Sequence, residues 1–326
     1  MKTKVILQFL CISIFMLPQI SLSQNTHRRE SLQEVMHRGA NFRTMPILDN
    51  LWFLWWDNVA LNTVDTSNIE VVYNLKYKRH SNSNESPVWM LTKLQIGTLY
   101  SKYYSIITQF NDDVQQVVAG NSGNNARMPG SGYNYEYTKE DRSVLDNSGK
   151  DYLNSEIWFN HRTTQIKERA HDYAKKNISI EYEEPLPKFE WELMGVTDTV
   201  AGYACSTAKT RFRGREWTVW FTLEIPVSAG PWKFNGLPGL ILKAQDDKMD
   251  YTWECQSVTQ TRNPIIYYKV EKKALTRSKW QRYMRQVHNS PLAMLGEGGS
   301  TVFIHKGNTI VDGDNWVIPY NPIELE

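Results

Sequence analysis

Carboxylates near the middle of the chain are the residues best placed for acid–base chemistry. Glu181 and Glu183 are two residues apart in a predicted strand, so their side chains point to the same face of it. Glycoside hydrolysis uses a pair of carboxylates, and a secreted hydrolase is therefore one alternative. Glu184 and Pro185 follow directly, and a strand end with exposed charge accounts for the same residues without any reaction.

Cys205 is a second candidate for chemistry, because a thiolate beside a histidine can act as a nucleophile. An inert thiol or a disulfide is the simpler interpretation. Cys205 and Cys255 are the two cysteines left once an N-terminal signal is removed, and both alternate in phase with aromatic neighbours, which predicts a disulfide between them. A simple meander opposes this pairing, since strands three apart lie ~14 Å from one another. A disulfide needs a Cα separation below ~7 Å.

The sequence carries no metal or cofactor motif. His161 and His171 lie on separate predicted strands, and His288 and His305 have no Cys or His neighbour at ligand spacing. A Gly-x-Ser-x-Gly elbow, a phosphate loop and a dinucleotide fingerprint are also missing. We therefore expect no metal, no cofactor and no assigned catalytic residue, and we favour a binding protein over an enzyme.

Arginines surround Gly214 in the segment Arg211–Glu216. Guanidinium groups bind carboxylate or phosphate bidentately, which makes Arg215 a ligand-binding candidate. A hairpin turn built on Gly214 explains the segment as well, with Arg215 bracing the loop that follows.

The connection Pro226–Gly239 is the most informative loop of the chain. A loop of this length without secondary structure is uncommon and tends to be functional or tightly packed. It is too apolar to remain in water, so we expect either a lid over an apolar cavity or a plug that completes the core. The ligand-binding or lid candidates are Trp232, Phe234 and Leu237 of the loop, Trp217 and Phe221 of the preceding strand, and Arg215; the residues expected to fix the shape are Gly230, Gly236, Pro238 and Gly239.

Alternating apolar and polar side chains around these candidates predict half-buried strands. In Trp217–Ile225, every second residue is bulky and apolar. Similar patterns predict strands at Ile69–Tyr73, Trp89–Ile96, Glu156–His161, Thr164–Asp172, Ile178–Glu183, Lys188–Met194, Thr199–Phe212, Leu240–Gln245, Tyr251–Val258 and Ile265–Val270. One helix is predicted at Tyr103–Val118, and another after Thr276 with Trp280, Met284 and Val287 facing inward. This order predicts a mainly β fold: a curved antiparallel sheet or half-barrel with a few helices packed on it.

Residues 1–23 have the pattern of a secretory signal peptide. Lys2 and Lys4 precede an apolar stretch too short to span a bilayer, and small residues lead to an expected cleavage after Ser23. Removing both lysines takes the formal charge of +2 to zero. A neutral chain gives no electrostatic case for nucleic acid. We expect a periplasmic or secreted protein with no transmembrane segment in the mature chain.

Three segments are predicted after export. Residues 24–62 form a helical, aromatic-rich extension whose Leu51–Trp56 stretch packs on the domain's own core or forms a docking patch. Residues 63–326 form the β domain. An Asn/Gly/Ser-rich stretch near 119–151 is a loop insertion in it.

Several short motifs, taken in order, resemble the GLPGLI family of exported bacterial proteins. They are Tyr182–Glu184, Gly202–Cys205, Phe212–Arg215, Trp217–Phe221, Glu224–Pro226, Gly230-Pro231, Gly236–Ile241 and Asn321–Leu325. The resemblance implies export in Gram-negative bacteria and an antiparallel β domain similar to the half-barrels of periplasmic lipoprotein carriers. It implies no activity, because the family has none assigned.

Our interpretation is a non-enzymatic binding or accessory protein that holds an apolar or peptide-like ligand or an outer-membrane partner. The first alternative is a secreted hydrolase using Glu181 and Glu183 or Cys205. The second is a structural accessory of an outer-membrane transporter or secretion system. A pocket that joins a carboxylate or thiol to a histidine would favour the hydrolase.

Overall fold

A computed structural model describes the part of the chain that forms the β domain. The described residues are 56, 59–81, 86–109, 112, 155–173, 175, 177–290, 304–306, 309–311 and 320–326. The predicted signal peptide, almost all of the predicted extension and the predicted insertion near 119–151 lie outside these residues.

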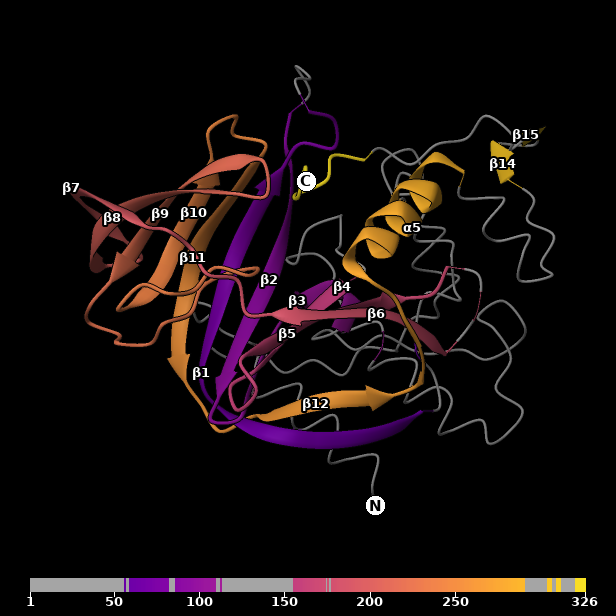
Figure 1. The fold of residues 1–326 in the computed structure, drawn as a ribbon, viewed down its shortest axis with the longest axis horizontal. Coiled ribbons are helices and arrows are strands. Elements are labelled where there is room, and N and C mark those ends of the chain that lie inside the picture. The colour runs from indigo at the N-terminus through magenta and orange to yellow at the C-terminus, as the bar shows by residue number, and fades with distance from the viewer. Residues whose placement is uncertain are drawn as a thin grey trace, which may run out of the picture.

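Strands account for most of the described chain (Figure 1). In chain order they are β1 (Ala60–Tyr77), β2 (Val88–Gly97), β3 (Tyr100–Ser105), β4 (Ser155–Asn160), β5 (Gln165–His171), β6 (Ile178–Pro185), β7 (Glu192–Val200), β8 (Tyr203–Phe212), β9 (Arg215–Thr222), β10 (Leu240–Asp246), β11 (Tyr251–Gln260), β12 (Pro264–Lys269), β13 (Glu271–Ala274), β14 (Ile304–Lys306) and β15 (Thr309–Val311). The helix α5 spans Arg277–Asn289. The prediction of a mainly β fold is confirmed.

One 13-stranded sheet holds β1 to β13 in the order β13-β6-β5-β4-β3-β2-β1-β11-β10-β9-β8-β7, with β12 paired to β1 off this path. The pairings are antiparallel except for β13, which runs parallel to β6. Strand β1 connects the two halves, because its first part pairs with β12 and its second part with β11. Register shifts occur along it, as between Ser67 and Ile69. Such bulges bend a strand, and Figure 1 shows β1 sweeping under β12 before it rises beside β2.

The hydrophobic core covers one face of the sheet. In β9, Trp217, Val219 and Phe221 are buried and belong to this core, as the alternating pattern predicts. The strand ends at Thr222, so Leu223 does not continue the inward face and is 61% exposed.

Loop Pro226–Gly239 packs its apolar side chains into this core. Trp232, Phe234 and Leu237 are all buried in it. The Phe234 ring lies 5.1 Å from that of Trp217 and 6.0 Å from that of Trp253. Burial of this kind favours a plug over a lid.

Close backbone approach explains one of the loop glycines. A Cβ on Gly239 would lie 1.9 Å from the carbonyl oxygen of Thr222, so no side chain fits there. Gly236 has a φ of +89°, which side chains other than hydrogen resist. Gly230 is buried against Ile241, and Pro238 is exposed.

Three predicted elements differ in part from the structure. The helix predicted at Tyr103–Val118 begins late: its first residues, as far as Ser105, belong to strand β3, because Tyr103 pairs with Leu94 of β2 and faces the core. The described residues that follow, 106–109 and 112, are helical as predicted. The strand predicted at Lys188–Met194 begins only at Glu192 and continues to Val200. A turn at Ala201 and Gly202, both with positive φ, divides the predicted Thr199–Phe212 strand into β7 and β8.

Helix α5 agrees with the sequence prediction in its cap and in most of its buried face. Thr276 caps α5 and accepts a hydrogen bond from the Lys279 backbone nitrogen, as predicted. Trp280 and Val287 are buried as expected, but Tyr283 rather than the half-buried Met284 is the third buried residue. None of the helices in the described ranges has the length and hydropathy needed to cross a membrane.

The β domain starts earlier than predicted. Strand β1 begins at Ala60, inside the range assigned to the N-terminal extension.

Candidate functional site

A polar, partly buried surface covers strands β3 to β6 on the face opposite the core. Lys102 pairs with Trp158, Trp158 with Lys167, and Glu156 with Arg169, so these side chains share a face. The residues between them, such as Ile157 and Phe159, belong to the core. The polar face therefore results from the alternation of the same strands that build the core.

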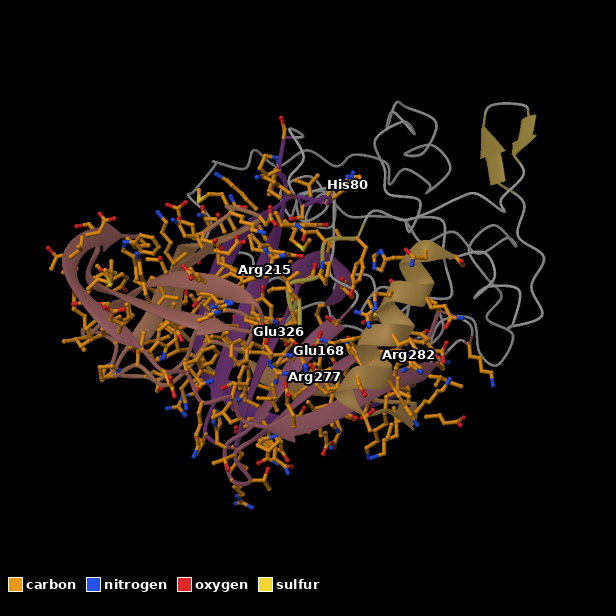
Figure 2. The ribbon with its side chains drawn as sticks, turned by 45° about the horizontal axis from the view of Figure 1, so that its top comes forward. His80, Glu168, Arg215, Arg277, Arg282 and Glu326 are labelled. Atoms are coloured by element: carbon orange, nitrogen blue, oxygen red, sulfur yellow. The ribbon has the colours of Figure 1, made fainter. Side chains whose placement is uncertain are left out.

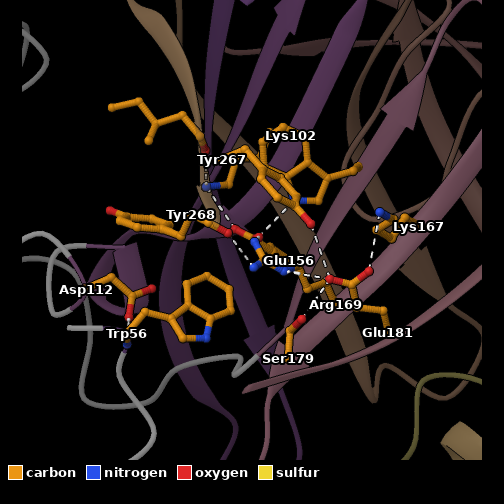
Figure 3. A network of polar contacts seen from close by, with 12 residues as sticks. Trp56, Lys102, Asp112, Glu156, Lys167, Arg169, Ser179, Glu181, Tyr267 and Tyr268 are labelled. Carbon is orange, nitrogen blue, oxygen red and sulfur yellow. Dashed lines mark hydrogen bonds and ion pairs between the residues drawn. The ribbon is translucent and has the colours of Figure 1, made fainter. Parts of the chain in front are cut away.

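A buried ion network lies at the centre of this face (Figure 3). Glu156 is 2.8 Å from Lys102 Nζ and 3.0 Å from Arg169 Nη1. Burial alone would raise the pKa of Glu156, but Lys102 and Arg169 outweigh it and hold that pKa below its ordinary value. The Arg169 guanidinium lies between two aromatic rings, 4.0 Å from the centroid of Trp56 and 4.2 Å from that of Tyr267.

Glu181 and Glu183 lie on this face side by side with Lys167, so the prediction that they share a face is confirmed. Lys167 Nζ is 3.3 Å from Glu181 and 3.1 Å from Glu183. The Glu181 carboxylate is buried and fully engaged: Ser179 Oγ donates to it at 2.7 Å, Tyr267 OH at 3.3 Å, and Arg169 Nε lies at 3.0 Å. A general acid must reach its substrate, and Glu181 does not.

A cavity of about 260 Å³ opens beside this network. Its aromatic walls meet edge to face, with the Trp158 ring 5.3 Å from that of Tyr267 and 6.5 Å from that of Tyr100. The lining residues combine these rings with apolar, amide and charged side chains: Val64, Tyr100, Trp158, Asn160, Gln165, Ile166, Lys167, Glu183 and Tyr267. Of the residues singled out in the sequence, only Glu183 lines it.

Arg215 lies elsewhere and holds the chain's C-terminal segment. All five of its N–H donors have acceptors nearby, so it has no donor left for a ligand. The hairpin turn at Arg213 and Gly214 is confirmed by the positive φ of both. The acceptors of Arg215 are Asp246 Oδ2 at 2.6 Å, Asp250 Oδ2 at 3.1 Å, Asn321 Oδ1 at 2.9 Å, Pro322 O at 2.8 Å and Ile323 O at 3.0 Å.

Lys233 makes a second anchor for the same segment, and nothing in its sequence context indicated it. Its side chain is fully buried, with Nζ 2.5 Å from Glu324 Oε1, 2.9 Å from Glu168 Oε2 and 2.5 Å from the Tyr182 hydroxyl. Arg277 of α5 reaches the other oxygen of Glu324, and Figure 2 shows Glu168 and Arg277 gathered between the sheet and this helix. Ion pairs therefore hold loop Pro226–Gly239 against the C-terminal segment.

Cys205 and Cys255 are both free and buried, so the predicted disulfide is wrong. Strands β9 and β10 separate β8 from β11, which is the meander that opposes the pairing. Burial raises the pKa of Cys205, and raises the pKa of Cys255 to about 12. A thiolate is the reactive form, so neither thiol is placed to act as a nucleophile at neutral pH.

We expect two thiols to titrate when the mature protein is denatured without reductant. In the native protein, the same reagent at pH 8 should react only slowly, because both thiols are buried and protonated. Ellman's reagent measures both values. An absence of free thiol in the denatured protein would contradict the fold, since β8 and β11 would then have to be neighbours.

Comparisons with known proteins give a family of unknown function and a distant structural likeness. A family model described as "Protein of unknown function (Porph_ging)" matches residues 207–243. No match was found among curated proteins. Two crystal structures of PNGF-II, in space groups P21 and C2, resemble the chain with TM-scores of 0.41 and 0.42. Each is 13% identical to it over 69% of this chain and 34% of PNGF-II, so the chain spans about a third of that protein's length. The family match runs from within β8 to within β10 and includes the whole of loop Pro226–Gly239.

Proposed function

We propose that this chain is an exported, non-enzymatic binding protein whose ligand occupies the cavity beside Trp158. The observation that carries the proposal is the cavity itself, about 260 Å³ in volume and walled by three aromatic rings. Concave sites with apolar walls and a few polar groups are where small ligands bind. We also propose that the chain is a GLPGLI-type protein, because the family match at 207–243 contains the Gly236–Ile241 motif. The signal-like residues 1–23 support a periplasmic or secreted location.

The lining favours a peptide-like ligand over a wholly apolar one. Tyr100, Trp158 and Tyr267 offer apolar contact to a side chain, while the amides of Asn160 and Gln165 can donate to and accept from a peptide backbone. The volume lies slightly below the ~300–1,000 Å³ range of drug-sized pockets. It therefore fits one residue of a peptide better than a long segment.

The candidate catalytic residues of the hydrolase alternative are not placed for catalysis. The hydrolase alternative needs a carboxyl or thiol group that can reach a substrate. Glu183 lines the cavity, but glycoside hydrolysis needs two carboxylates at the substrate, and Glu181 is buried against two cations and two hydroxyl groups. Burial also raises the pKa of both cysteines. We therefore propose binding without covalent chemistry.

Native mass spectrometry of the exported protein tests this proposal. We expect a peptide-like species to co-purify with wild type and to be lost from Tyr100→Ala, which removes a half-buried wall of the cavity. Trp89→Ala is the matched control, because Trp89 is an exposed aromatic outside the lining. Retention of the bound species by Tyr100→Ala, or no bound species in wild type, would contradict the proposal.

A further inference from the structure

Lys167 is the positive charge at the cavity, and its two carboxylate partners are unlike each other. Glu181 is buried at 4% side-chain exposure and is fixed by Ser179 and Arg169. Glu183 is 53% exposed and lines the cavity. Water competes strongly with an ion pair at an exposed carboxylate. The Lys167–Glu183 contact is therefore the one that an incoming anion can replace.

The charges of the network leave room for one such anion. Lys102, Lys167 and Arg169 supply three positive charges, and Glu156 and Glu181 supply two buried negative ones. Glu183 brings the sum to zero. If Glu183 swings out to solvent, the sum is restored by one carboxylate bound at Lys167 Nζ.

We propose that Lys167 receives the C-terminal carboxylate of a peptide, which displaces Glu183, while the last side chain of the peptide lies among Trp158, Tyr100 and Tyr267. The inference rests on the proposed function and names the part of the ligand that this site binds. A chain end fits better than an internal segment, because the cavity accommodates one residue and offers one cation whose exposed partner, Glu183, can be displaced. Burial opposes the charge on Lys167, yet Glu181 and Tyr267 raise its pKa, so the ammonium stays charged.

Three probes separate the possible ligands: glycyl-glycyl-phenylalanine, its C-terminal amide, and phenylpropionate as a free apolar acid. Isothermal titration calorimetry should give ~10-fold or tighter binding of the free peptide than of the amide, since a charged hydrogen bond is lost with the carboxylate. Lys167→Met should remove that difference. Binding of phenylpropionate without binding of the peptide would overturn the peptide terminus as the ligand.

The Glu183→Gln variant gives the sharpest test, because it should improve binding. Removing the internal competitor should tighten binding of the free peptide about two- to fivefold and leave the amide unchanged. Glu192→Gln, on the exposed edge strand β7, is the control and should change neither. Weaker binding of the free peptide by Glu183→Gln would overturn the inference. If free peptide and amide bind equally and Tyr100→Ala weakens both, the inference fails while the proposed function stands; if no probe binds, both fail.

Discussion

Replacing Phe234 by alanine should lower the free energy of unfolding by about 3–5 kcal/mol, because its ring is fully buried in the core. The ring packs against Trp217, Trp232 and Trp253, with centroids 5.1 to 6.0 Å away. Rigid aromatic neighbours held from three segments cannot collapse into the space left behind. The cavity cost should therefore fall in the upper part of that range. Urea denaturation of the two proteins measures it.

Leu223→Ala provides the control for this experiment. Leu223 directly follows the same aromatic strand but is 61% exposed, so its truncation should change stability by less than about 0.5 kcal/mol. A lid would behave differently from a plug. If Phe234→Ala unfolded like wild type and lost only bound ligand, the loop would be a lid, and the packing described for it would be wrong.

Much of the sheet could be predicted from sequence, because strands buried on one face reveal themselves by alternation. The predicted inward residues Trp217, Val219 and Phe221 are in the core. Alternation could not decide between lid and plug for Phe234, since both need the same apolar residues. A plug requires β9, β11 and the loop to close around the ring, and only the tertiary structure shows whether they do.

The errors also have physical causes. Tyr103–Val118 has apolar residues at helical spacing, yet Tyr103 is held in β3 by pairing with β2. Local propensity is a weak prior when a sheet offers an open edge. The disulfide prediction failed because the strands keep the simple meander order, with β9 and β10 between β8 and β11. Facing the same side of the sheet does not bring Cys205 and Cys255 within bridging distance.

The candidate site was only partly predictable. Spacing within one strand placed Glu181 and Glu183 on a common face, and a pair of residues so close in sequence needs no tertiary information. Lys102, Glu156 and Tyr267 come from strands far apart in sequence and have no diagnostic spacing. The cavity exists only because β12 turns back over β1 and brings Tyr267 to Trp158.

Replacing Lys233 by methionine should cost about 3–5 kcal/mol, comparable to losing the Phe234 ring. Lys233 is the fully buried cation between Glu168 and Glu324. Removing one partner of a buried pair leaves the other charge without compensation. Lys188→Met is the control. Because Lys188 is exposed, this variant should change stability by less than about 0.5 kcal/mol. Equilibrium urea denaturation at pH 7 compares both variants with wild type.

The pH dependence and a double variant identify charge as the cause. Burial would raise the pKa of Glu324, but Lys233 and Arg277 lower it below the ordinary 4.5, so its contribution is present above that pH and is lost as pH falls through the folded pKa. The pKa of Lys233 is raised above 10.5 by the nearby Glu168 and Glu324 despite its burial, so its contribution lasts until alkaline pH. The cost of Lys233→Met should therefore be largest between these limits and shrink below pH 4.5, where protonation neutralises the stranded carboxylates. Adding Glu324→Gln should recover part of the loss, giving a double variant less destabilised than the sum of its parts. An additive pair, or a cost that does not change with pH, would mean that Lys233 stabilises the loop through packing alone.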